Sequence, residues 1–437
     1  MELFPYLRYR DELTEHVRCP VHGFIRYSQK ERQIIDDPYF QRLRNIRQLA
    51  LCYYVYPGAV HSRFEHSLGV MEMATRAFNV LASKSGEILE RELKQIPELQ
   101  TDTLRNALQA VRLLALLHDV GHPAFSHAAE GALPGGKKHE EVSKYVIDVI
   151  LREKLDAMFF PGVSDLLIRI LSNSPDVIFL RQFVVGELDM DRTDYLLRDS
   201  LHCGVEYGKF DFQRLLESLA VLVHPDTGRL QIGIERGGEH TFEALILARY
   251  QMNTQVYYHK VRRIYDHYLL EYMKLWATEK YRDFDDVLRF DDLKVLSEMM
   301  ADAATNSPRA EIAKRILGRN HHKVVYHTGD SADALQLRKA KRILQSLGEQ
   351  FSGIDFWLDD DAKGSIHKLM ARGQQEESKV EDFFIVEKSG AITLITEDSA
   401  ILEKIPREFR VVRIYADADS EVIDEIERVA HALRQER

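Results

Sequence analysis

The chain has 437 residues, of which 45% are hydrophobic and 29% are charged, and its formal net charge is -10 at pH 7. A chain of this length can form two or three domains, and its acidic balance argues against a broad nucleic-acid surface, which needs basic excess. No apolar run reaches the length of a membrane span, the first residues lack a signal-peptide core, and three scattered cysteines favour a reducing cytoplasm.

The first hundred residues alternate turns and helices. Pro20 and Gly23 predict a short extended or turn element. A helix is predicted from Pro38, and a second one, capped by Ser62, is predicted to reach about Leu81. Residues 84–101 are predicted to form a further charged helical segment. The apolar stripe of the first helix consists of Phe40, Leu43, Ile46 and Leu49.

A dense run of titratable residues follows the next predicted helix, which spans residues 104–117. The run contains His118, Asp119, His122 and His127. Packing alone has little use for so many titratable groups together, so the run indicates a metal site. A histidine and an aspartate at the end of a helix can turn toward one ion, and His66 and Asp191 are candidates to complete the site.

The side chains at this site suggest which metal it binds and what reaction it catalyses. Imidazole with carboxylate suits Mn, Fe, Zn or Mg better than a copper–thiolate centre. Two histidines and two carboxylates leave coordination positions for water and substrate, and a water of lowered pKa is a nucleophile near neutral pH. Hydrolysis at phosphorus is the reaction that this chemistry favours, because a metal and basic residues neutralise oxyanions.

The glycine-rich loop at 131–138 resembles a P-loop in spacing only. It follows a helix and ends in Lys137-Lys138, whereas a P-loop follows a strand and ends in Lys-Ser or Lys-Thr. Residues 141–220 are mostly helical by pattern. A hairpin of 220–223 with 230–234 comes next, and then one long helix over 242–276.

The last third of the chain changes composition twice. Residues 280–350 are charged and helical by pattern. Residues 383–386 and 392–395 flank a turn and predict a hairpin, 411–415 predicts a third strand, and 421–433 predicts a closing helix. The overall prediction is a mainly α chain with short β hairpins. It divides into a core over 1–280, a helical extension over 281–350 and a small α+β accessory domain over 351–437.

The order His66, His118-Asp119, Asp191 resembles the H…HD…D signature of HD-domain phosphohydrolases. Additional stretches resemble the deoxynucleoside triphosphate triphosphohydrolase branch of that family; they are residues 40–44, 53–59, 63–70, 125–127, 191–199 and 257–260. They span roughly residues 15–275 in the right order. The resemblance implies an HD-domain helical core over 1–280.

The resemblance also implies a role for each site residue. One divalent metal (Mn, Mg, Fe or Zn) would be held by His66, His118, Asp119 and Asp191. His127 and His139 would face the phosphates with His122 nearby, and one histidine would act as general acid. Glu130, where the family more often has aspartate, would pair with His139. Arg63, Arg192 and Arg249 would grip the triphosphate, and the sugar would be lined by Gln48, Tyr195, Asp199 and Tyr257.

The reaction implied is hydrolysis of a dNTP to deoxynucleoside and inorganic triphosphate, by water attacking the α-phosphorus, with a further Mg carried by the triphosphate. Two alternatives stay open: an HD phosphohydrolase acting on a cyclic or alarmone nucleotide, and a nucleotide-binding regulator with little turnover. Without the resemblance, the tyrosines would be read as core aromatics and Arg249 as part of a solvated face. On the same reading, caps or surface charge would explain Asp189, Asp194 and Asp199.

Relatives can bind a regulatory nucleotide at subunit interfaces. Asp36, Gln41 and Arg44 resemble part of such a site, but Glu15 stands where a phosphate-binding lysine is expected. An acid there would repel a nucleotide. We therefore expect a homo-oligomer, dimer or tetramer, whose nucleotide activator, where one acts, is bound by different chemistry. No membrane partner is expected.

Overall fold

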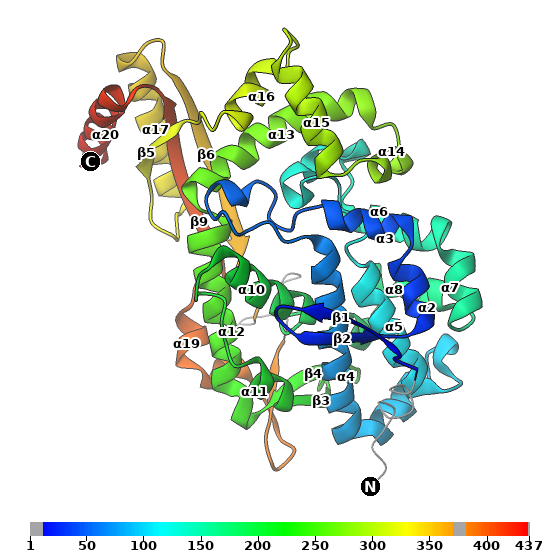
Figure 1. Ribbon diagram of the computed structural model, residues 1–437. Coiled ribbons are helices and arrows are strands. Elements are labelled where there is room, and N and C mark those ends of the chain that lie inside the picture. Colours follow the sequence, from blue (N-terminus) through cyan, green and yellow to red (C-terminus); the bar gives the residue numbers. More distant parts are fainter. Residues whose placement is uncertain (1–11, 370–381, 436–437) are drawn as a thin grey trace.

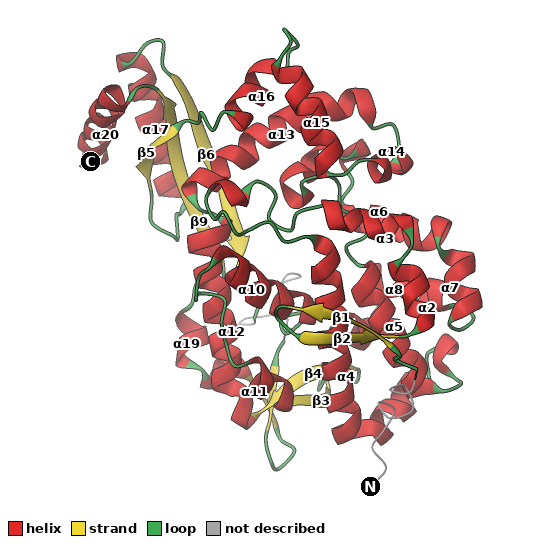
Figure 2. Cartoon of the chain, in the orientation of Figure 1, coloured by secondary structure: helices red, strands yellow, loops and turns green. Residues whose placement is uncertain are grey.

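The computed structural model describes residues 12–369 and 382–435, so the prediction about the first residues lies outside it. The described chain is mainly helical with three small sheets, which confirms the predicted fold class (Figures 1 and 2). The helices are α2 (Gln29–Ile35), α3 (Pro38–Gln41), α4 (Arg63–Leu93), α5 (Thr103–Leu117), α6 (His139–Tyr145), α7 (Arg152–Met158), α8 (Val163–Leu171), α9 (Ile178–Arg181), α10 (Met190–Cys203), α11 (Phe212–Glu217), α12 (Glu239–Met252), α13 (Lys260–Lys280), α14 (Phe284–Arg289), α15 (Asp292–Ala303), α16 (Ala310–Leu317), α17 (Ala334–Gln350), α18 (Ile395–Asp398), α19 (Ala400–Lys404) and α20 (Ser420–Gln435). The strands are β1 (Glu15–Cys19), β2 (Gly23–Tyr27), β3 (Leu219–Val223), β4 (Leu230–Glu235), β5 (Lys323–His327), β6 (Asp355–Ser365), β7 (Phe384–Val386), β8 (Ile392–Leu394) and β9 (Glu408–Asp417).

Helices α4 and α5 pack together in the core, and α5 leads directly into the titratable run that begins at His118. Helix α5 is buried on every side apart from the partly exposed Arg105, and α4 packs along it. Ser62 begins α4 through a reciprocal capping box with Glu65, as its sequence position predicts. Helix α4 continues to Leu93 rather than ending near residue 81. It bends at Ser85, which has non-helical backbone angles, close to the predicted break.

Two predicted helices are shorter than expected. The helix that begins at Pro38 ends at Gln41 and passes into a 3-10 turn over Arg42–Asn45. The long helix predicted over 242–276 is divided, because a π-helical turn over Asn253–Tyr257 separates α12 from α13. A pattern of apolar residues cannot distinguish these tighter and wider turns from continuous α-helix.

The three sheets join parts of the chain that are far apart in sequence. Strands β1 and β2 form a hairpin, and β3 and β4 form the predicted antiparallel pair. The predicted hairpin β7–β8 is present, but it extends the β3–β4 sheet through a parallel pairing of Ile234 with Ile385. The predicted strand over 411–415 is β9, which lies between β5 and β6 in a different sheet. The predicted tail therefore shares one sheet with the core and another with β5, a strand that the pattern over 280–350 did not indicate.

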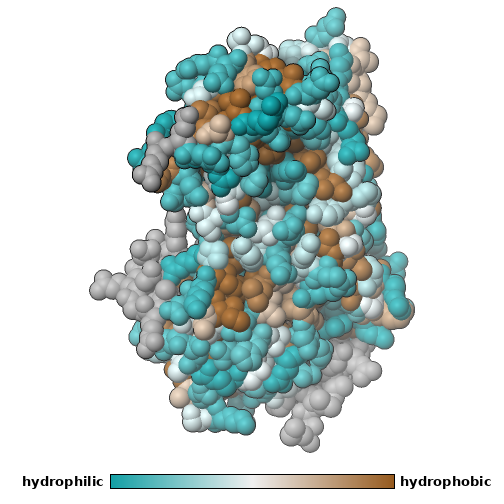
Figure 3. All heavy atoms as spheres, turned by 90° about the vertical axis from the view of Figure 1, so that its left-hand side faces the viewer, coloured by the Kyte–Doolittle hydropathy of each residue, from teal (hydrophilic) through white to brown (hydrophobic). Residues whose placement is uncertain are grey.

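The sheet β5–β9–β6 lies beside α13, with α17 and α20 packed on it, at the upper left of Figure 1. On the face that includes this sheet, hydrophilic side chains predominate and hydrophobic ones gather in separate patches (Figure 3). Among the residues that the structure describes, no helix combines the length and the apolar character that crossing a bilayer requires.

Candidate metal and nucleotide site

Four predicted side chains converge at the meeting point of α4, α5 and α10, and we call them the His-Asp cluster: His66, His118, Asp119 and Asp191. The Nε2 atom of His66 lies 2.9 Å from Asp191 Oδ1 and 3.6 Å from Asp119 Oδ2. The Nε2 atom of His118 lies 3.7 Å from Asp191 Oδ1 and 3.5 Å from Asp119 Oδ1. Among the described residues, His66, His118 and Asp191 form one of the groups whose ligand atoms all lie within 4.8 Å of one another.

The outer nitrogen of each imidazole is fixed by an acceptor. Nδ1 of His66 donates to Asp194 Oδ2 at 2.8 Å, and Nδ1 of His118 donates to the carbonyl oxygen of Ala115 at 2.8 Å. With the proton on Nδ1, the lone pair of each ring lies on Nε2, directed at the shared centre. Both Nε2 atoms are buried and have no hydrogen-bond partner in the described part of the chain. This arrangement fits a cation, which accepts two such lone pairs.

Asp194 is the centre of the support behind His66. It also accepts hydrogen bonds from His22, which lies in the β1–β2 turn, and from Arg198 one turn further along α10. Gly69 of α4 permits this contact, because a Cβ there would overlap the carboxylate of Asp194 and the guanidinium of Arg198. The prediction that Asp194 is a cap or surface charge is wrong, because the residue is fully buried.

The electrostatics of the cluster follow from burial with opposite charges close by. Burial disfavours charge on His66, but the carboxylates of Asp191 and Asp194 raise its pKa to about 10, so a cation bound at Nε2 would take the place of the second proton of this ring. Burial likewise opposes the charge of Asp119, yet Arg63, His118 and His122 hold its pKa well below the usual range. The carboxylates are therefore ionised at neutral pH, the form in which they bind cations.

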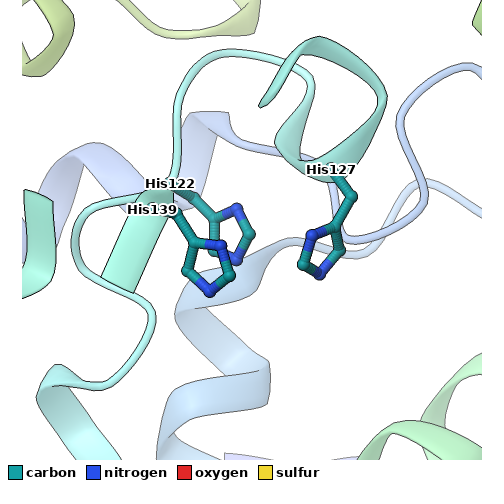
Figure 4. Close-up of side chains that lie close together, drawn as sticks. All are labelled: His122, His127 and His139. Carbon is teal, nitrogen blue, oxygen red and sulfur yellow. The ribbon is translucent and has the colours of Figure 1, made fainter. Parts of the chain in front are cut away.

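A second group of imidazoles, the histidine trio of His122, His127 and His139, lies on the other side of Asp119. The rings of His122 and His139 are stacked with their centroids 3.8 Å apart, and His127 faces them edge-on from the 3-10 helix Ser126–Ala132 (Figure 4). Nε2 of His122 is 3.2 Å from Asp119 Oδ1. Burial, with the charges of Arg63 and His139, lowers the pKa of His122 well below its usual value, so its ring is neutral.

Glu130 links two members of the trio. Its Oε1 accepts hydrogen bonds from Nδ1 of His139 at 2.6 Å and from the His139 backbone amide at 3.0 Å. Its Oε2 lies 3.5 Å from Nδ1 of His127. The predicted contact between Glu130 and His139 is therefore present, although glutamate replaces the aspartate that the family more often has. Its hydrogen bonds overcome burial and hold the pKa of Glu130 below the usual range.

The backbone just before His127 is strained. Phe125 and Ser126 have φ values of 62° and 59°, a region that residues with side chains seldom adopt. Asp292 accepts the amide hydrogen of Phe125 at 2.6 Å, and the Ser126 hydroxyl accepts from Nε of Arg63 at 2.6 Å. Strain of this kind persists where surrounding contacts enforce it, and here it directs His127 toward the site. The His127 side chain is 61% exposed, so it is open to a ligand.

A pocket of about 660 Å³ adjoins the His-Asp cluster, and we call it the tyrosine pocket. Arg63 belongs to its wall and also pairs with Asp119, so the two sites share a residue. The pocket wall includes six predicted site residues, namely Gln48, Arg63, His127, Tyr195, Asp199 and Tyr257. A volume of this size suits a small-molecule ligand.

Asp199 is buried in the pocket wall and holds two neighbours. Its Oδ1 accepts from Nε2 of His61 at 2.6 Å, and its Oδ2 accepts from the Tyr257 hydroxyl at 2.7 Å. The ring of Tyr195 lies edge-on to that of Tyr257, with their centroids 6.0 Å apart. Asp199 is thus no surface charge, whereas Asp189 is the N-cap of α10, as the alternative reading of that residue predicted.

The other two predicted triphosphate contacts lie outside the pocket wall. Arg192 donates to the carbonyl oxygen of Glu187 at 2.7 Å and lies 3.7 Å from Asp189. Arg249 is half-buried and donates to the carbonyl oxygen of Ile366 at 2.7 Å. Both guanidinium groups therefore have protein partners in this structure, and their contact with a triphosphate stays a prediction.

Comparison with known proteins agrees with this geometry. Residues 63–181 match the HD domain family, and residues 210–350 match the HD associated region. The chain therefore contains an HD domain. The matched segment 63–181 includes His66, His118 and Asp119, three of the four residues of the His-Asp cluster, whereas Asp191 follows it on α10.

Individual relatives extend the match of this HD-domain protein. It is 35% identical to an uncharacterized protein of Methanocaldococcus jannaschii over 64% of this chain and 54% of that one. It is 29% identical to the deoxynucleoside triphosphate triphosphohydrolase SAMHD1 of Bos taurus, over 71% of this chain and 58% of that protein. The chain thus spans little more than half the length of these relatives. A phosphohydrolase crystal structure from Bacteroides thetaiotaomicron superposes with a TM-score of 0.70 and 25% identity, covering 93% of this chain and all of that one.

Sequence reasoning missed the supporting residues of this HD-domain site. Asp194 follows Asp191 by three positions on one helix face, a spacing that could have indicated a role beside it. His22, His61 and Asp292 come from distant segments, and no local pattern marks them. Asn253 was missed because the predicted continuous helix concealed the π-helical turn that begins with it.

Proposed function

We propose that this protein is a metal-dependent phosphohydrolase that cleaves a deoxynucleoside triphosphate at the α-phosphorus, releasing deoxynucleoside and inorganic triphosphate. The observation that carries the proposal is the shared wall at Arg63, which places a nucleotide-sized pocket directly beside the His-Asp cluster. The named activity of SAMHD1 and of the phosphohydrolase from Bacteroides thetaiotaomicron supports the same class of reaction.

The residues of the His-Asp cluster fit a divalent cation. Two imidazole Nε2 atoms, which have no hydrogen-bond partner among the described residues, meet two ionised carboxylates, and this set suits Mn, Fe, Zn or Mg. The chemistry that a cation held by these four residues would supply is a water acidified to a nucleophile at neutral pH and neutralisation of phosphate charge. A further Mg would accompany the triphosphate as its counter-ion.

The residues around the cluster would bind and orient the substrate. Arg63 is anchored by Asp119 and Ser126, so its charge lies between the cluster and the pocket, where an α-phosphate bridging them would rest. The tyrosines and Gln48 would line the sugar, with Asp199 fixing the Tyr257 hydroxyl. A close fit around the sugar would exclude a 2′-hydroxyl.

The histidine trio would supply the proton for the leaving group. Glu130 orients His139 through Nδ1, which leaves Nε2 of His139 free to exchange a proton with substrate. The exposed His127, also beside Glu130, would contact the triphosphate. Protonation of the departing 5′ oxygen prevents build-up of alkoxide charge as the bond to the α-phosphorus breaks.

Product analysis tests the proposal directly. Purified protein is incubated with each dNTP and NTP in the presence of Mn or Mg, and the products are separated by chromatography. Deoxynucleoside with inorganic triphosphate is the expected result, whereas mono- or diphosphate products would contradict it. Absence of turnover would support a nucleotide-binding regulator. His118→Ala should abolish the reaction, and His240→Ala, at an exposed position on α12, is the matched control.

We further propose that this protein forms a homo-oligomer. We also propose that its regulation by nucleotide differs from that of the relatives, because Glu15 stands where a phosphate-binding lysine is expected. Glu15 accepts a hydrogen bond from Gln29 and pairs with Arg32 at 3.5 Å, and Arg32 also binds Asp36. Through these contacts Glu15 belongs to the same surface as Asp36, Gln41 and Arg44. Light scattering with and without added nucleotide measures both the subunit number and any change that nucleotide causes.

A further inference from the structure

The two ends of the tyrosine pocket differ in charge. The end beside the His-Asp cluster carries Arg63 and His127. The far end is formed by α13 and by a bulge in β6, which contribute Arg262 and Arg263 against Asp266 and Asp359–Asp361. The carboxylates there are matched by cations, because Arg263 binds Asp359, Lys341 lies 3.4 Å from Asp360 and Lys363 lies 3.3 Å from Asp361. Arg63 at the near end lies beside the His-Asp cluster, so a triphosphate would be drawn to the near end. A nucleotide bound in this pocket would therefore direct its base toward α13 and β6.

Polar atoms without partners gather in the same pocket wall. Within the described residues, Asn253 Nδ2, Asp266 Oδ1 and the Nε and Nη1 atoms of Arg262 are buried and make no hydrogen bond. Asn253 is 7% exposed and the Asp266 side chain 13% exposed, so solvent hydrates them poorly. Buried polar atoms are normally paired, and unpaired ones in a pocket wall indicate a ligand that supplies the missing partner.

The neighbouring ion pair of Arg263 with Asp359 differs from Arg262 and Asp266, because its hydrogen bonds are satisfied within the protein. Arg263 donates to both oxygens of the buried Asp359, at 2.8 and 3.1 Å, and Arg413 lies 3.7 Å from the same carboxylate. Arg262 and Asp266 stand one turn apart on the same helix, yet their closest approach is 3.5 Å, without a hydrogen bond. The first pair ties β6 to α13, whereas the second is left unsatisfied.

We propose that Asn253, Arg262 and Asp266 read the nucleobase, and that the pocket selects bases bearing an exocyclic amino group. This assignment rests on the proposed function, because it requires the base to lie at the far end of the pocket. A carboxylate accepts from an amino N–H, while the amide and the guanidinium donate to ring nitrogens and carbonyl oxygens. Among the described carboxylates of the pocket wall, Asp266 keeps an acceptor atom without a hydrogen bond, and that atom favours bases with an N–H donor.

Cytosine and uracil give the sharpest comparison, because they have the same size and shape. Cytosine presents a 4-amino group, which Asp266 would accept from. Uracil presents a carbonyl oxygen at the same position. That oxygen and the Asp266 carboxylate are both hydrogen-bond acceptors, so no hydrogen bond could form between them. The two bases thus differ at the 4-position, which carries the group that Asp266 would contact.

Two measurements on the full chain test the assignment. The first is kcat/KM for dCTP and dUTP under matched metal conditions, for which the wild type should favour dCTP by about tenfold. The second is calorimetric binding of deoxycytidine and deoxyuridine, which needs no hydrolysis. Asp266→Asn, whose amide can donate or accept, should reduce both preferences to about twofold or less. Asp355→Asn, on the same strand as the bulge but outside the pocket, is the control that should retain them.

The outcomes separate this inference from the proposed reaction. Cleavage of both nucleotides with a wild-type ratio near one overturns the base-reading assignment and leaves the reaction intact. Preferential binding of deoxycytidine without any cleavage supports the assignment and contradicts the reaction. An unchanged preference in Asp266→Asn also overturns the assignment, and the wild-type comparison decides the matter alone should that variant fail to fold.

Discussion

The His-Asp cluster and the tyrosine pocket adjoin each other, yet their polar atoms are held differently. In the cluster, each imidazole is fixed from behind, His66 by Asp194 and His118 by the Ala115 carbonyl oxygen. In the pocket, Asn253 and Asp266 keep atoms without partners within the described chain. Under the proposed function, the reacting geometry would be set before the substrate arrives, and the substrate would complete the hydrogen bonds of the recognition groups.

The largest expected effect comes from removing a cluster residue. Asp191→Ala deletes a carboxylate that lies 2.9 Å from His66 and 3.7 Å from His118, so hydrolysis should fall by about three orders of magnitude or more. Binding of a nucleoside in the pocket should persist, because Asp191 is not part of its wall. Steady-state kinetics and nucleoside calorimetry measure the two effects. Loss of nucleoside binding together with hydrolysis would show that the two regions do not act separately.

A supporting residue should have a smaller effect of the same kind. Asp194→Asn weakens the acceptor behind His66, and metal affinity should fall by roughly 10- to 100-fold. Metal titration by calorimetry measures it, with thermal melting to follow the fold. Asp189→Asn on the same helix is the control, because asparagine caps a helix as well as aspartate does. Equal metal affinity in both variants would mean that Asp194 serves packing alone.

Glu130 should affect turnover more than metal binding. Glu130→Ala removes the acceptor that orients His139, so kcat should fall by about 10- to 100-fold while metal affinity stays unchanged. Glu140→Ala is matched to it, because Glu140 lies 3.5 Å from the same Nδ1 but is half exposed. Single-turnover kinetics compare the variants. A fall of equal size in both would assign the effect to the charge near His139 rather than to its orientation.

A buried ion pair outside both regions should affect stability alone. Arg112 of α5 binds both oxygens of Glu31 at 2.7 and 2.9 Å, and it overcomes burial to lower the pKa of Glu31 below its usual value of 4.5. This contribution to stability is complete above pH 4.5 and is lost as the pH falls toward the lowered value. Glu31→Gln should lose about 3–5 kcal/mol of stability at neutral pH.

Unfolding curves from pH 7 to pH 3 measure this loss. The melting temperature of the wild type should fall more steeply below pH 4.5 than that of Glu31→Gln, while base preference stays the same in both. Parallel curves for the two proteins would show that other carboxylates govern acid unfolding.

Several features could be predicted from local sequence. The helix from Ser62 and the buried helix over 104–117 follow from a capping residue and from apolar spacing, and both place their titratable residues correctly. The hairpins β3–β4 and β7–β8 follow from turn residues between β-forming runs. The 3-10 turn after α3 and the π-helical turn at Asn253 could not be predicted, because all three helix types share similar apolar spacing.

By itself, the sequence determined which metal-binding side chains are available, since the imidazole and carboxylate groups of His66, His118, Asp119 and Asp191 have the same metal preference in any fold. Tertiary structure alone decided how those groups are supported and what lies beside them. His22 and Asp194 are brought together from residues 172 positions apart, and β6 forms the far wall of the pocket although it follows α13 by 75 residues. Such contacts depend on how helices and sheets pack, and packing is set by long-range burial that no local pattern records.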